Sequence, residues 1–333
     1  MAVMVTGGTG FVGLNLVHAL LARGEHVVVA ALDDIPAPAR STFATLPGRL
    51  EAVRADIRDI TADPAAFTAL LRYHAVDRLF PFAAITSGPA REAAAPELVV
   101  QVNLLGFMAQ LRAARDAGVR RVIAPSSASA YGDSFFTHAL LDEATTPCVP
   151  NGVYGMTKYA VERCGLRLGE LWGLDVIAAR IGSVFGPWER DTGLRDMIGP
   201  HHYLARRAVA RQAAVLPAAI PASAWVYGPD VARGLLHLLD MENPPHRSFN
   251  ICSGQMWGEV ITSWADTLAE HYPGFTWRRA DDATPADIRF TELRPRGRMD
   301  IARIQATGWQ PQYSPAAAYA HYAAWLAENT DAL

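Results

Sequence analysis

The sequence predicts an α/β protein built on a doubly wound parallel sheet of the Rossmann type, with a smaller, discontinuous region in the C-terminal half. The first half of the chain alternates short apolar runs with helix-like segments, which is typical of buried parallel strands covered on both faces. A glycine-rich turn follows the first run. The 333 residues are 50% hydrophobic and 19% charged, so the chain can form a sizeable core and bulk disorder is excluded.

The elements follow in order along the chain. Strands are predicted over Ala2–Thr6, His26–Leu32, Leu50–Ala55, Arg78–Phe82, Val119–Pro125, Asp175–Ile181 and Ser248–Cys252. Helices are predicted over Gly10–Arg23, Asp63–His74, Pro96–Ala117, Val153–Trp172, Asp230–Met241, Trp257–His271 and Pro315–Asn329. Between Gly186 and about Tyr227 the sequence is rich in Arg and Pro and shows no clear period.

The turn TGGTGFVG joins the first strand to the first helix. Gly7 permits the tight turn, Gly10 lets a pyrophosphate approach the backbone, and Gly13 allows close helix packing, with the phosphates on the helix N-terminus beside Phe11 and Val12. This predicts a dinucleotide-binding domain over residues 1–182, with 228–252 returning to it. Residues 183–227 and 253–333 are then expected to form the substrate-binding region.

An acidic side chain at the end of the second strand would accept hydrogen bonds from the adenosine ribose and disfavour a 2′-phosphate. Asp33 and Asp34 are the candidates, and Asp33 is the expected cofactor contact, although an acid usually stands at the position of Ala31. NAD is therefore favoured as the cofactor, and NADP stays open. Further cofactor contacts are expected after the third and fourth strands, from Asp56, Ile57, Phe82, Ala83 and Ala84.

Lys158 is the only lysine among the 30 Lys and Arg residues of the chain. Tyr154 stands four residues before it on a predicted helix, so the phenol and the ammonium share a face. A nearby ammonium favours the phenolate, which would make Tyr154 a better base. Lys158 could also donate to the nicotinamide ribose, which a planar guanidinium would do badly.

Three serines stand at the end of the fifth strand, where ligands of doubly wound sheets bind. They are Ser126, Ser127 and Ser129. A hydroxyl there can hold the substrate oxygen while Tyr154 moves the proton. The alternative is a serine-rich turn that satisfies backbone groups.

These residues resemble the extended short-chain dehydrogenase/reductase superfamily, in its NAD-dependent epimerase/dehydratase group with the UDP-glucose 4-epimerase-like proteins. The resemblance covers nearly the whole chain through TGGTGFVG, Asp56-Ile57, QVNLLG, PSSASAYGD, YGMTK, RIGSVFGP, WVYGPDVA and GWQP. It implies Ser127 as the substrate-oxygen contact, Tyr154 as acid/base and Lys158 as ribose ligand. It also implies that Asn103 positions a water or the fourth helix.

Departures from the family pattern bear on the substrate. Ala128 and Ser129 replace an Asp-Glu pair of relatives that make 4-keto-6-deoxy sugars, which disfavours 4,6-dehydration. Ser223 replaces an Arg usual in relatives that bind nucleotide sugars, and Ser183 replaces a common Asn. Positive charge would come instead from Arg190, Arg195, Arg294, Arg296 and Arg298. The expected substrate contacts are Ser127, Ser129, Ser183, Arg190 and Arg298.

The leading hypothesis is an NAD(P)-dependent oxidoreductase that acts on a secondary alcohol of a carbohydrate-like small molecule, such as a sugar, a sugar acid or a related hydroxy acid. A second hypothesis is a nucleotide-sugar epimerase with tightly bound NAD. A third, of another class, is a non-catalytic dinucleotide-binding sensor on the same scaffold. The Tyr154/Lys158 pair argues against the third.

Composition also bears on partners. The formal net charge of −3 indicates no nucleic-acid partner. The cysteines Cys148, Cys164 and Cys252 have neither zinc-site nor disulfide-framework spacing, so we expect no metal. We expect no secretory leader and no membrane span, and hence a cytoplasmic protein. Pro96–Ala117 and Val153–Trp172 resemble the helices that pair between subunits in the family, which predicts a homodimer.

Overall fold

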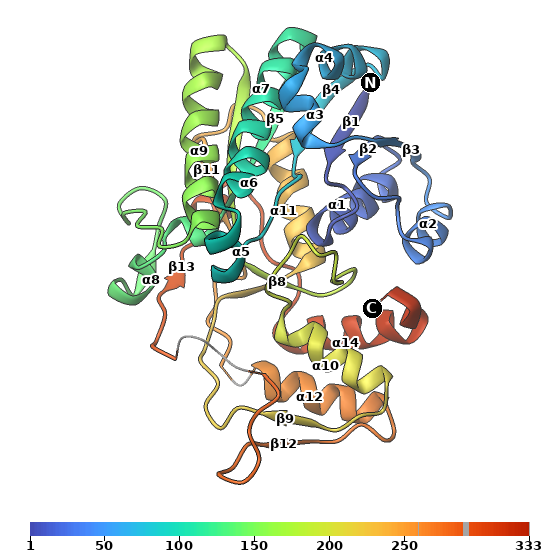
Figure 1. Cartoon of the computed structure of the whole chain (residues 1–333), viewed down its shortest axis with the longest axis vertical. Coiled ribbons are helices and arrows are strands. Elements are labelled where there is room, and N and C mark those ends of the chain that lie inside the picture. Colours follow the sequence, from blue (N-terminus) through green and yellow to red (C-terminus); the bar gives the residue numbers. More distant parts are fainter. Residues whose placement is uncertain (259, 289–292, 333) are drawn as a thin grey trace.

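A computed structural model describes residues 1–258, 260–288 and 293–332. Its centre is a seven-stranded parallel sheet with the strand order β11-β7-β5-β4-β1-β2-β3 (Figure 1). These strands are β1 (Ala2–Thr6), β2 (His26–Ala31), β3 (Arg49–Arg54), β4 (Val76–Pro81), β5 (Arg121–Ser127), β7 (Asp175–Ile181) and β11 (Ser248–Ile251). The strand order reverses beside β1, so the predicted doubly wound fold is confirmed.

Helices cover both faces of the sheet. One face packs on α1 (Phe11–Ala22) and α11 (Gly228–Asp240), and the other on α4 (Pro64–Tyr73), α7 (Gly106–Ala117) and α9 (Val153–Trp172). Along β1, Val3 and Val5 belong to the first core, whereas Ala2 and Met4 belong to the second. Successive side chains of a strand point to opposite faces, so burial of both faces explains the uninterrupted apolar runs.

The predicted helix over Pro96–Ala117 contains a break in its regular hydrogen bonding. It consists of α6 (Pro96–Val100), a π-helical turn η1 (Gln101–Leu105) and α7. Other short elements connect the strands of the sheet: α2 (Ala37–Phe43), α3 (Ile57–Ala62), α5 (Pro89–Ala94) and the 3₁₀ turn η2 (Ala128–Ala130). The π turn holds Asn103, which is buried.

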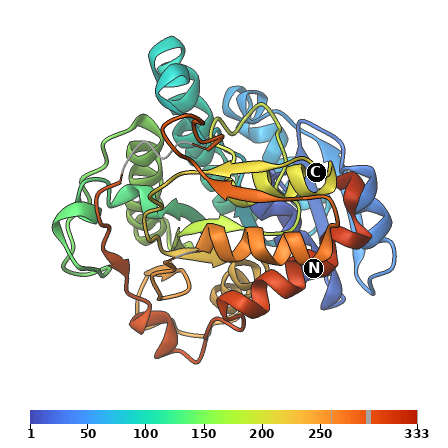
Figure 2. The same cartoon turned by 90° about the horizontal axis from the view of Figure 1, so that it is seen from below.

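A separate core lies in the C-terminal half, between α10 (Pro200–Val209), α12 (Val260–His271) and α14 (Pro315–Glu328). Figure 2 shows α12 and α14 side by side. Two small parallel pairs complete this part: β8 (Ser183–Phe185) with β10 (Trp225–Tyr227), and β9 (Ala214–Leu216) with β12 (Trp277–Arg279).

The sequence did not predict α10. Its inward face includes His201, Leu204, Ala205 and Ala208, which have helical spacing. The pattern was obscured because His201 ranks as polar in a hydropathy pattern although it is fully buried here. The neighbouring arginines of the segment further reduced its apolar character.

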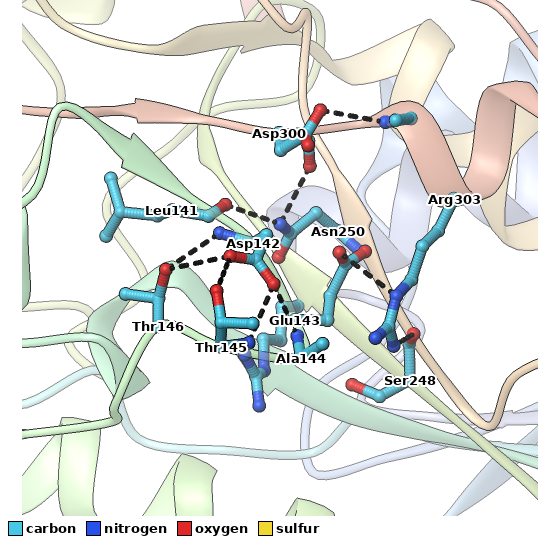
Figure 3. Close-up of polar contacts among 12 residues, drawn as sticks. Leu141, Asp142, Glu143, Ala144, Thr145, Thr146, Ser248, Asn250, Asp300 and Arg303 are labelled. Carbon is cyan, nitrogen blue, oxygen red and sulfur yellow. Dashed lines mark hydrogen bonds and ion pairs between the residues drawn. The ribbon is translucent and has the colours of Figure 1, made fainter.

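Polar contacts fasten the loop before α9 to the edge strand β11 (Figure 3). The buried Glu143 carboxylate accepts the Asn250 backbone N–H at 2.6 Å, and the Asn250 side chain donates to the carbonyl oxygens of Leu141 and Asp300 at 3.1 and 2.8 Å. These contacts join β6 (Leu140–Leu141), β11 and the start of α13 (Ala302–Gln305). The remaining short elements are α8 (Ser134–Thr137), β13 (Arg298–Met299) and η3 (Thr330–Ala332).

Three further observations bear on the sequence expectations. Across residues 1–258, 260–288 and 293–332, no helix combines the length and the apolar character needed to cross a membrane. In the same residues, no group of three or more His, Cys, Asp or Glu side chains could hold a metal ion. The three cysteines are free: Cys252 is buried, and Cys148 and Cys164 are half-buried.

Candidate active site

A cleft of about 1430 Å³ lies at the carboxyl ends of the sheet strands and extends to α10. Its volume exceeds that of a usual small-molecule pocket, so it has room for a dinucleotide and a second ligand. All of the predicted site residues except Asn103 and Arg298 line it. The lining set is Gly7, Gly10, Phe11, Val12, Gly13, Asp33, Asp56, Ile57, Phe82, Ala83, Ala84, Ser127, Ser129, Tyr154, Lys158, Ser183 and Arg190.

The glycine-rich turn forms a cradle that side chains would fill. Gly7 has a φ of +64°, and a Cβ there would lie 2.6 Å from the Cα of Ala83. A Cβ on Gly13 would lie 2.5 Å from the Gly7 carbonyl oxygen, whereas one on Gly10 would meet only that oxygen, at 3.3 Å. Gly10 also caps α1 without a side-chain hydrogen bond. The first N–H groups of α1 thus suit the diphosphate of a dinucleotide.

At the other end of the cradle, Asp33 follows β2 and is exposed in the cleft. Arg190 comes from the segment after β8, and its guanidinium donates to the Thr9 carbonyl oxygen at 3.0 Å. Its pKa is lowered by burial, while the charge of Asp33 acts in the opposite direction. Arg190 therefore lies against the glycine-rich turn, although the sequence suggested a substrate contact.

Asp56 caps α3 by accepting the Arg58 backbone N–H at 2.8 Å, and it forms an ion pair with the Arg58 side chain. The Arg58 hydrogen bonds hold the pKa of Asp56 below its usual value. Its carboxylate is thus already engaged as a helix cap. The neighbouring Ile57 is buried against the core that includes α7 and also lines the cleft.

Tyr154 and Lys158 face the same part of the cleft from α9. The Lys158 Nζ lies 5.7 Å from the centre of the Tyr154 ring. Burial lowers the pKa of Lys158 to about 8. Burial also raises the pKa of Tyr154, while the hydroxyls of Ser127 and Thr86 and the charge of Arg195 act to lower it. The expectation that the pKa of Tyr154 is lowered is therefore wrong for the protein without a bound cofactor. Desolvation of the phenolate outweighs the effect of the nearby positive charge.

Ser126 and Ser127, the last two residues of β5, have different contacts. Ser127 lies at the end of the strand, beside Tyr154, and its hydroxyl accepts the Ser129 backbone N–H at 3.1 Å. Ser126 is buried and donates to the Glu162 carboxylate on α9 at 2.8 Å. Of these two hydroxyls, Ser127 is the one placed to contact a substrate oxygen near Tyr154.

Two predicted site residues lie outside the cleft lining. Asn103 accepts the Ile85 N–H at 2.8 Å and donates to the Ile85 carbonyl oxygen and the Thr157 hydroxyl. It therefore fixes the chain after β4 to α9, next to Tyr154. Arg298 belongs to β13 and donates to the Gly254 carbonyl oxygen at 2.9 Å. The structure does not bring Arg298 to the reaction centre.

Sequence reasoning missed several residues of the cleft. Thr86 was not singled out, although it follows Phe82-Ala83-Ala84, and its hydroxyl interacts with Tyr154. The segment after β8 was given no structure, and His202, at the start of the helix α10 to which it leads, was not singled out. Arg195 on this segment was named as one of several sources of positive charge. Only the proximity of Thr86 to the small residues ending β4 offered a sequence signal for either Thr86 or His202.

A family model describes the chain from residue 3 to residue 252 as NAD dependent epimerase/dehydratase family. The chain belongs to this family. The predicted resemblance is confirmed, and the family to which the chain belongs is one of NAD-dependent enzymes. The cradle formed by Gly7, Gly10 and Gly13 fits that cofactor.

The matches to curated relatives differ in the share of each chain that they cover. Sterol demethylase protein B of Methylococcus capsulatus is 35% identical over 198 residues, which are 57% of this chain and 53% of that protein. The match thus spans about half the length of that relative. A dTDP-glucose 4,6-dehydratase of Xanthomonas campestris is 26% identical over 332 residues, with 93% and 89% of the two chains covered.

A UDP-glucose-4-epimerase of Stenotrophomonas maltophila, solved with bound NAD and a formylated UDP-arabinopyranose, superimposes with a TM-score of 0.80. The two sequences are 22% identical, and the superposition covers 100% of both chains. At this identity the likeness shows the shared fold. It does not assign a substrate to this chain.

Proposed function

We propose that this chain is an NAD-dependent oxidoreductase that transfers a hydride to or from a secondary alcohol carbon of a carbohydrate-like small molecule. One observation carries the proposal. The phenol of Tyr154 lies with the hydroxyls of Ser127 and Thr86 in the same cleft as the glycine cradle, with Lys158 beside it. This arrangement supplies an acid/base, a holder for the substrate oxygen and a place for a dinucleotide.

The residues of the chain have distinct tasks in this reaction. The turn holding Gly10 and the first N–H groups of α1 would bind the cofactor diphosphate, and Lys158 would donate to the ribose hydroxyls. NAD, when bound, accepts or supplies the hydride at its nicotinamide ring. Ser127 would hold the substrate oxygen while Tyr154 moves the proton.

The direction of proton transfer follows from the pKa of Tyr154. Because burial raises it, the phenol keeps its proton at neutral pH and is ready to protonate a carbonyl oxygen during reduction. Oxidation of an alcohol needs the phenolate instead. The positive charges of Lys158 and Arg195 both favour that form, since opposite charges stabilise an anion.

A nucleotide-sugar epimerase with tightly bound NAD uses the same groups, and the relatives include proteins named as such epimerases. In that case hydride returns to the same carbon on its other face, and no reduced cofactor accumulates. Measuring reduced nicotinamide by absorbance with UDP-glucose, free sugars and sugar acids separates the two reactions. The sensor hypothesis loses support because the family consists of enzymes.

Replacement of Tyr154 tests the assignment. Tyr154→Phe is expected to lower kcat by about 10²–10⁴-fold, the usual contribution of a positioned acid/base, while the Kd for NAD stays unchanged. Tyr159→Phe, on the same helix but outside the cleft lining, is the matched control and should keep full activity. Full activity in Tyr154→Phe would refute the proposed function.

The assembly and location of the chain remain proposals as well. We infer a homodimer formed through the segment Pro96–Ala117, which comprises α6, η1 and α7, and through α9. Exposed apolar side chains at Leu105, Met156 and Leu171 support it. A monomer by light scattering at micromolar concentration would contradict it. Three free cysteines support a reducing, cytoplasmic location. We also propose the division into a dinucleotide-binding part and a discontinuous substrate part, which is supported by the separate core of α10, α12 and α14 in the C-terminal half.

A further inference from the structure

The segment 188–199, which we name the strap, is tied to the chain that follows β4. Thr86 and Arg195 form a parallel bridge, in which the Thr86 N–H donates to the Leu194 carbonyl oxygen at 2.9 Å and Asp196 N–H donates to that of Thr86 at 3.0 Å. Arg91 on α5 forms an ion pair with Asp196 at 2.6 Å. The strap therefore holds the backbone of Arg195 next to Thr86, whose hydroxyl interacts with Tyr154.

The Arg195 side chain is only partly satisfied by the protein. Its Nη1 forms an ion pair with Glu189 Oε1 at 2.9 Å, and its guanidinium lies 5.2 Å from the centre of the Phe11 ring. The Glu189 side chain is 0% exposed, whereas that of Arg195 is 24% exposed and lines the cleft. Within the described part of the chain, the Nε and Nη2 of Arg195 have no hydrogen-bond partner.

This arrangement suits the binding of an anion. A guanidinium presents its N–H donors in a rigid fork that matches two oxygens of a carboxylate or phosphate. Glu189 fixes one end of the fork, and Glu189 itself is held by the Gly199 N–H at 2.9 Å. The other donors of Arg195 are left to face the cleft. A solvent-exposed ion pair would hold the arginine only weakly, because water competes for both charges. The buried Glu189 carboxylate holds Arg195 in one orientation, which supports its role as a ligand contact.

A second buried polar group points to a ligand at the same place. His202, the third residue of the helix that begins after the strap, is 1% exposed and lines the cleft. Its Nδ1 has no hydrogen-bond partner in the described part of the chain. Burial lowers the pKa of this histidine to about 4, so its ring is neutral and can take part in one hydrogen bond at Nδ1.

The position of these groups bears on the kind of substrate. Ser223 also lines the cleft, at the place where nucleotide-sugar relatives usually carry an arginine for the diphosphate. Among the arginines that line the cleft, Arg195 is the one bridged to Thr86, and its charge acts on Tyr154. Arg206, Arg207 and Arg296 line other parts of the cleft. An anion bound by Arg195 is therefore close to the alcohol carbon. A carboxylate near the secondary alcohol satisfies this geometry, whereas a distant diphosphate does not.

Building on the proposed function, we propose that Arg195 binds the carboxylate of the substrate, so that the enzyme acts on a hydroxy acid of the sugar-acid class. Glu189 is its positioning residue. The shared chemistry is an oxyanion in the fork of Arg195, and the cofactor diphosphate is the other possible source of that oxyanion. The experiment below separates the two.

The test uses Arg195→Lys, which keeps a positive charge beside Glu189 but removes the forked arrangement of N–H donors. Wild-type protein is assayed on sugar acids and on neutral sugars of matched chain length. We expect wild type to prefer the acids, and Arg195→Lys to lower kcat/KM for them by about 10–100-fold, the range of a lost charge-assisted hydrogen bond. The Kd values for NAD and ADP-ribose should stay within twofold of wild type. The value of kcat/KM for neutral sugars should fall less than that for the acids, because the substituted side chain keeps a positive charge near Tyr154.

Controls keep the result interpretable. Arg278→Lys changes an arginine of similar type, paired with Asp281 outside the cleft, and should have no effect. If Arg195→Lys does not fold, the double variant Glu189→Gln/Arg195→Met removes both charges of the pair. Loss of the Arg195 charge near Tyr154 should then lower kcat/KM for all substrates, and the loss should be larger for the acids than for the neutral sugars.

Two outcomes would overturn the inference. Weaker binding of NAD and ADP-ribose by Arg195→Lys would assign the oxyanion to the cofactor. Equal use of acids and neutral sugars by wild type, or equal losses on both in the variant, would leave no carboxylate site. Neither outcome touches the proposed function, which fails if Tyr154→Phe stays active or if no substrate changes the amount of reduced nicotinamide.

Discussion

Helix α9 carries two buried charged side chains one turn apart, Glu162 and Lys158, and the contacts of the two differ. The Glu162 side chain is 1% exposed and accepts two hydrogen bonds from Arg180 on β7, at 2.7 and 2.8 Å. It also accepts the hydroxyls of Ser126 on β5 and Ser248 on β11. Lys158 is 5% exposed, and its Nζ has no hydrogen-bond or ion-pair partner among the described residues.

The difference separates a structural charge from a functional one. Glu162 fixes α9 against three strands of the sheet, and that register places Tyr154 beside Ser127. Lys158 is left without an anion at the surface of the cleft, so its unsatisfied ammonium is available to a ligand. The Glu189–Arg195 pair combines both cases, because the glutamate is enclosed while part of the arginine fork faces the cleft.

The largest effect on stability is expected where the enclosed pair is broken. Arg180→Met leaves the Glu162 carboxylate buried without its cation and should lower the free energy of unfolding by about 3–5 kcal/mol. The double variant Glu162→Gln/Arg180→Met should recover most of that loss, because no uncompensated charge remains. Urea unfolding followed by circular dichroism measures both. Equal losses in the single and double variants would show that packing, not charge, governs this contact.

The difference between regular elements and segments fixed by long-range contacts explains what the sequence could and could not predict. The strands and the glycine turn were predictable because both faces of the sheet are apolar and the turn has a fixed spacing. Tyr154, Lys158 and Ser127 were predictable because they stand on regular elements. The strap was not, because its course depends on long-range contacts such as that of Asp196 with Arg91 and Gly88. No local pattern encodes which arginine meets a distant backbone.

The pKa of Tyr154 was also beyond sequence reasoning. Spacing showed that Lys158 shares its face, but the net direction depends on how deeply the phenol is buried. Likewise, Arg298 and Arg190 were grouped as substrate contacts from charge alone. The fold places one in β13, away from the cleft lining, and the other against Thr9.

A second prediction concerns Lys158, whose ammonium has no hydrogen-bond or ion-pair partner among the described residues. Since burial lowers the pKa of Lys158 from 10.5 to about 8, the folded chain binds this proton less tightly than the unfolded chain does. At pH 7 the buried ammonium therefore destabilises the cofactor-free protein. Lys158→Met should raise the free energy of unfolding by up to about 3 kcal/mol at pH 7 while reducing activity severely.

The pH dependence gives this prediction its sign. Between pH values of about 8 and 10.5 the unfolded chain holds more protons at this residue, so wild-type stability should rise with pH relative to Lys158→Met. The advantage of the variant should thus shrink at pH 9.5. Urea unfolding of cofactor-free protein at both pH values measures it. A variant that is less stable than wild type at pH 7 would mean that an unseen partner satisfies Lys158.

The smallest effect is expected at the partly exposed ion pair that ties the strap to α5. Asp196 accepts hydrogen bonds from Arg91 and from the Gly88 N–H, and the Arg91 interaction is the main cause that holds the pKa of Asp196 below its usual value. Asp196→Asn should cost only about 0.5–1 kcal/mol, because the pair is partly solvated. The loss should appear locally, as about a two- to fivefold faster tryptic cleavage after Arg190 and Arg195.

Its pH dependence follows from the depressed pKa of Asp196. The stabilisation is present above the ordinary value of 3.8 and is lost as pH falls through the lower folded value, so wild type and Asp196→Asn should converge in acid. Asp191→Asn is the matched control, since Asp191 lies in the same strap and, among the described residues, accepts only the Gly193 N–H, at 2.9 Å. Hydrogen exchange at the Thr86 and Asp196 amides, at pH values of about 7 and 3, measures the difference. Equal protection in Asp196→Asn and wild type at neutral pH would show that the backbone bridge to Thr86 alone holds Arg195 in place.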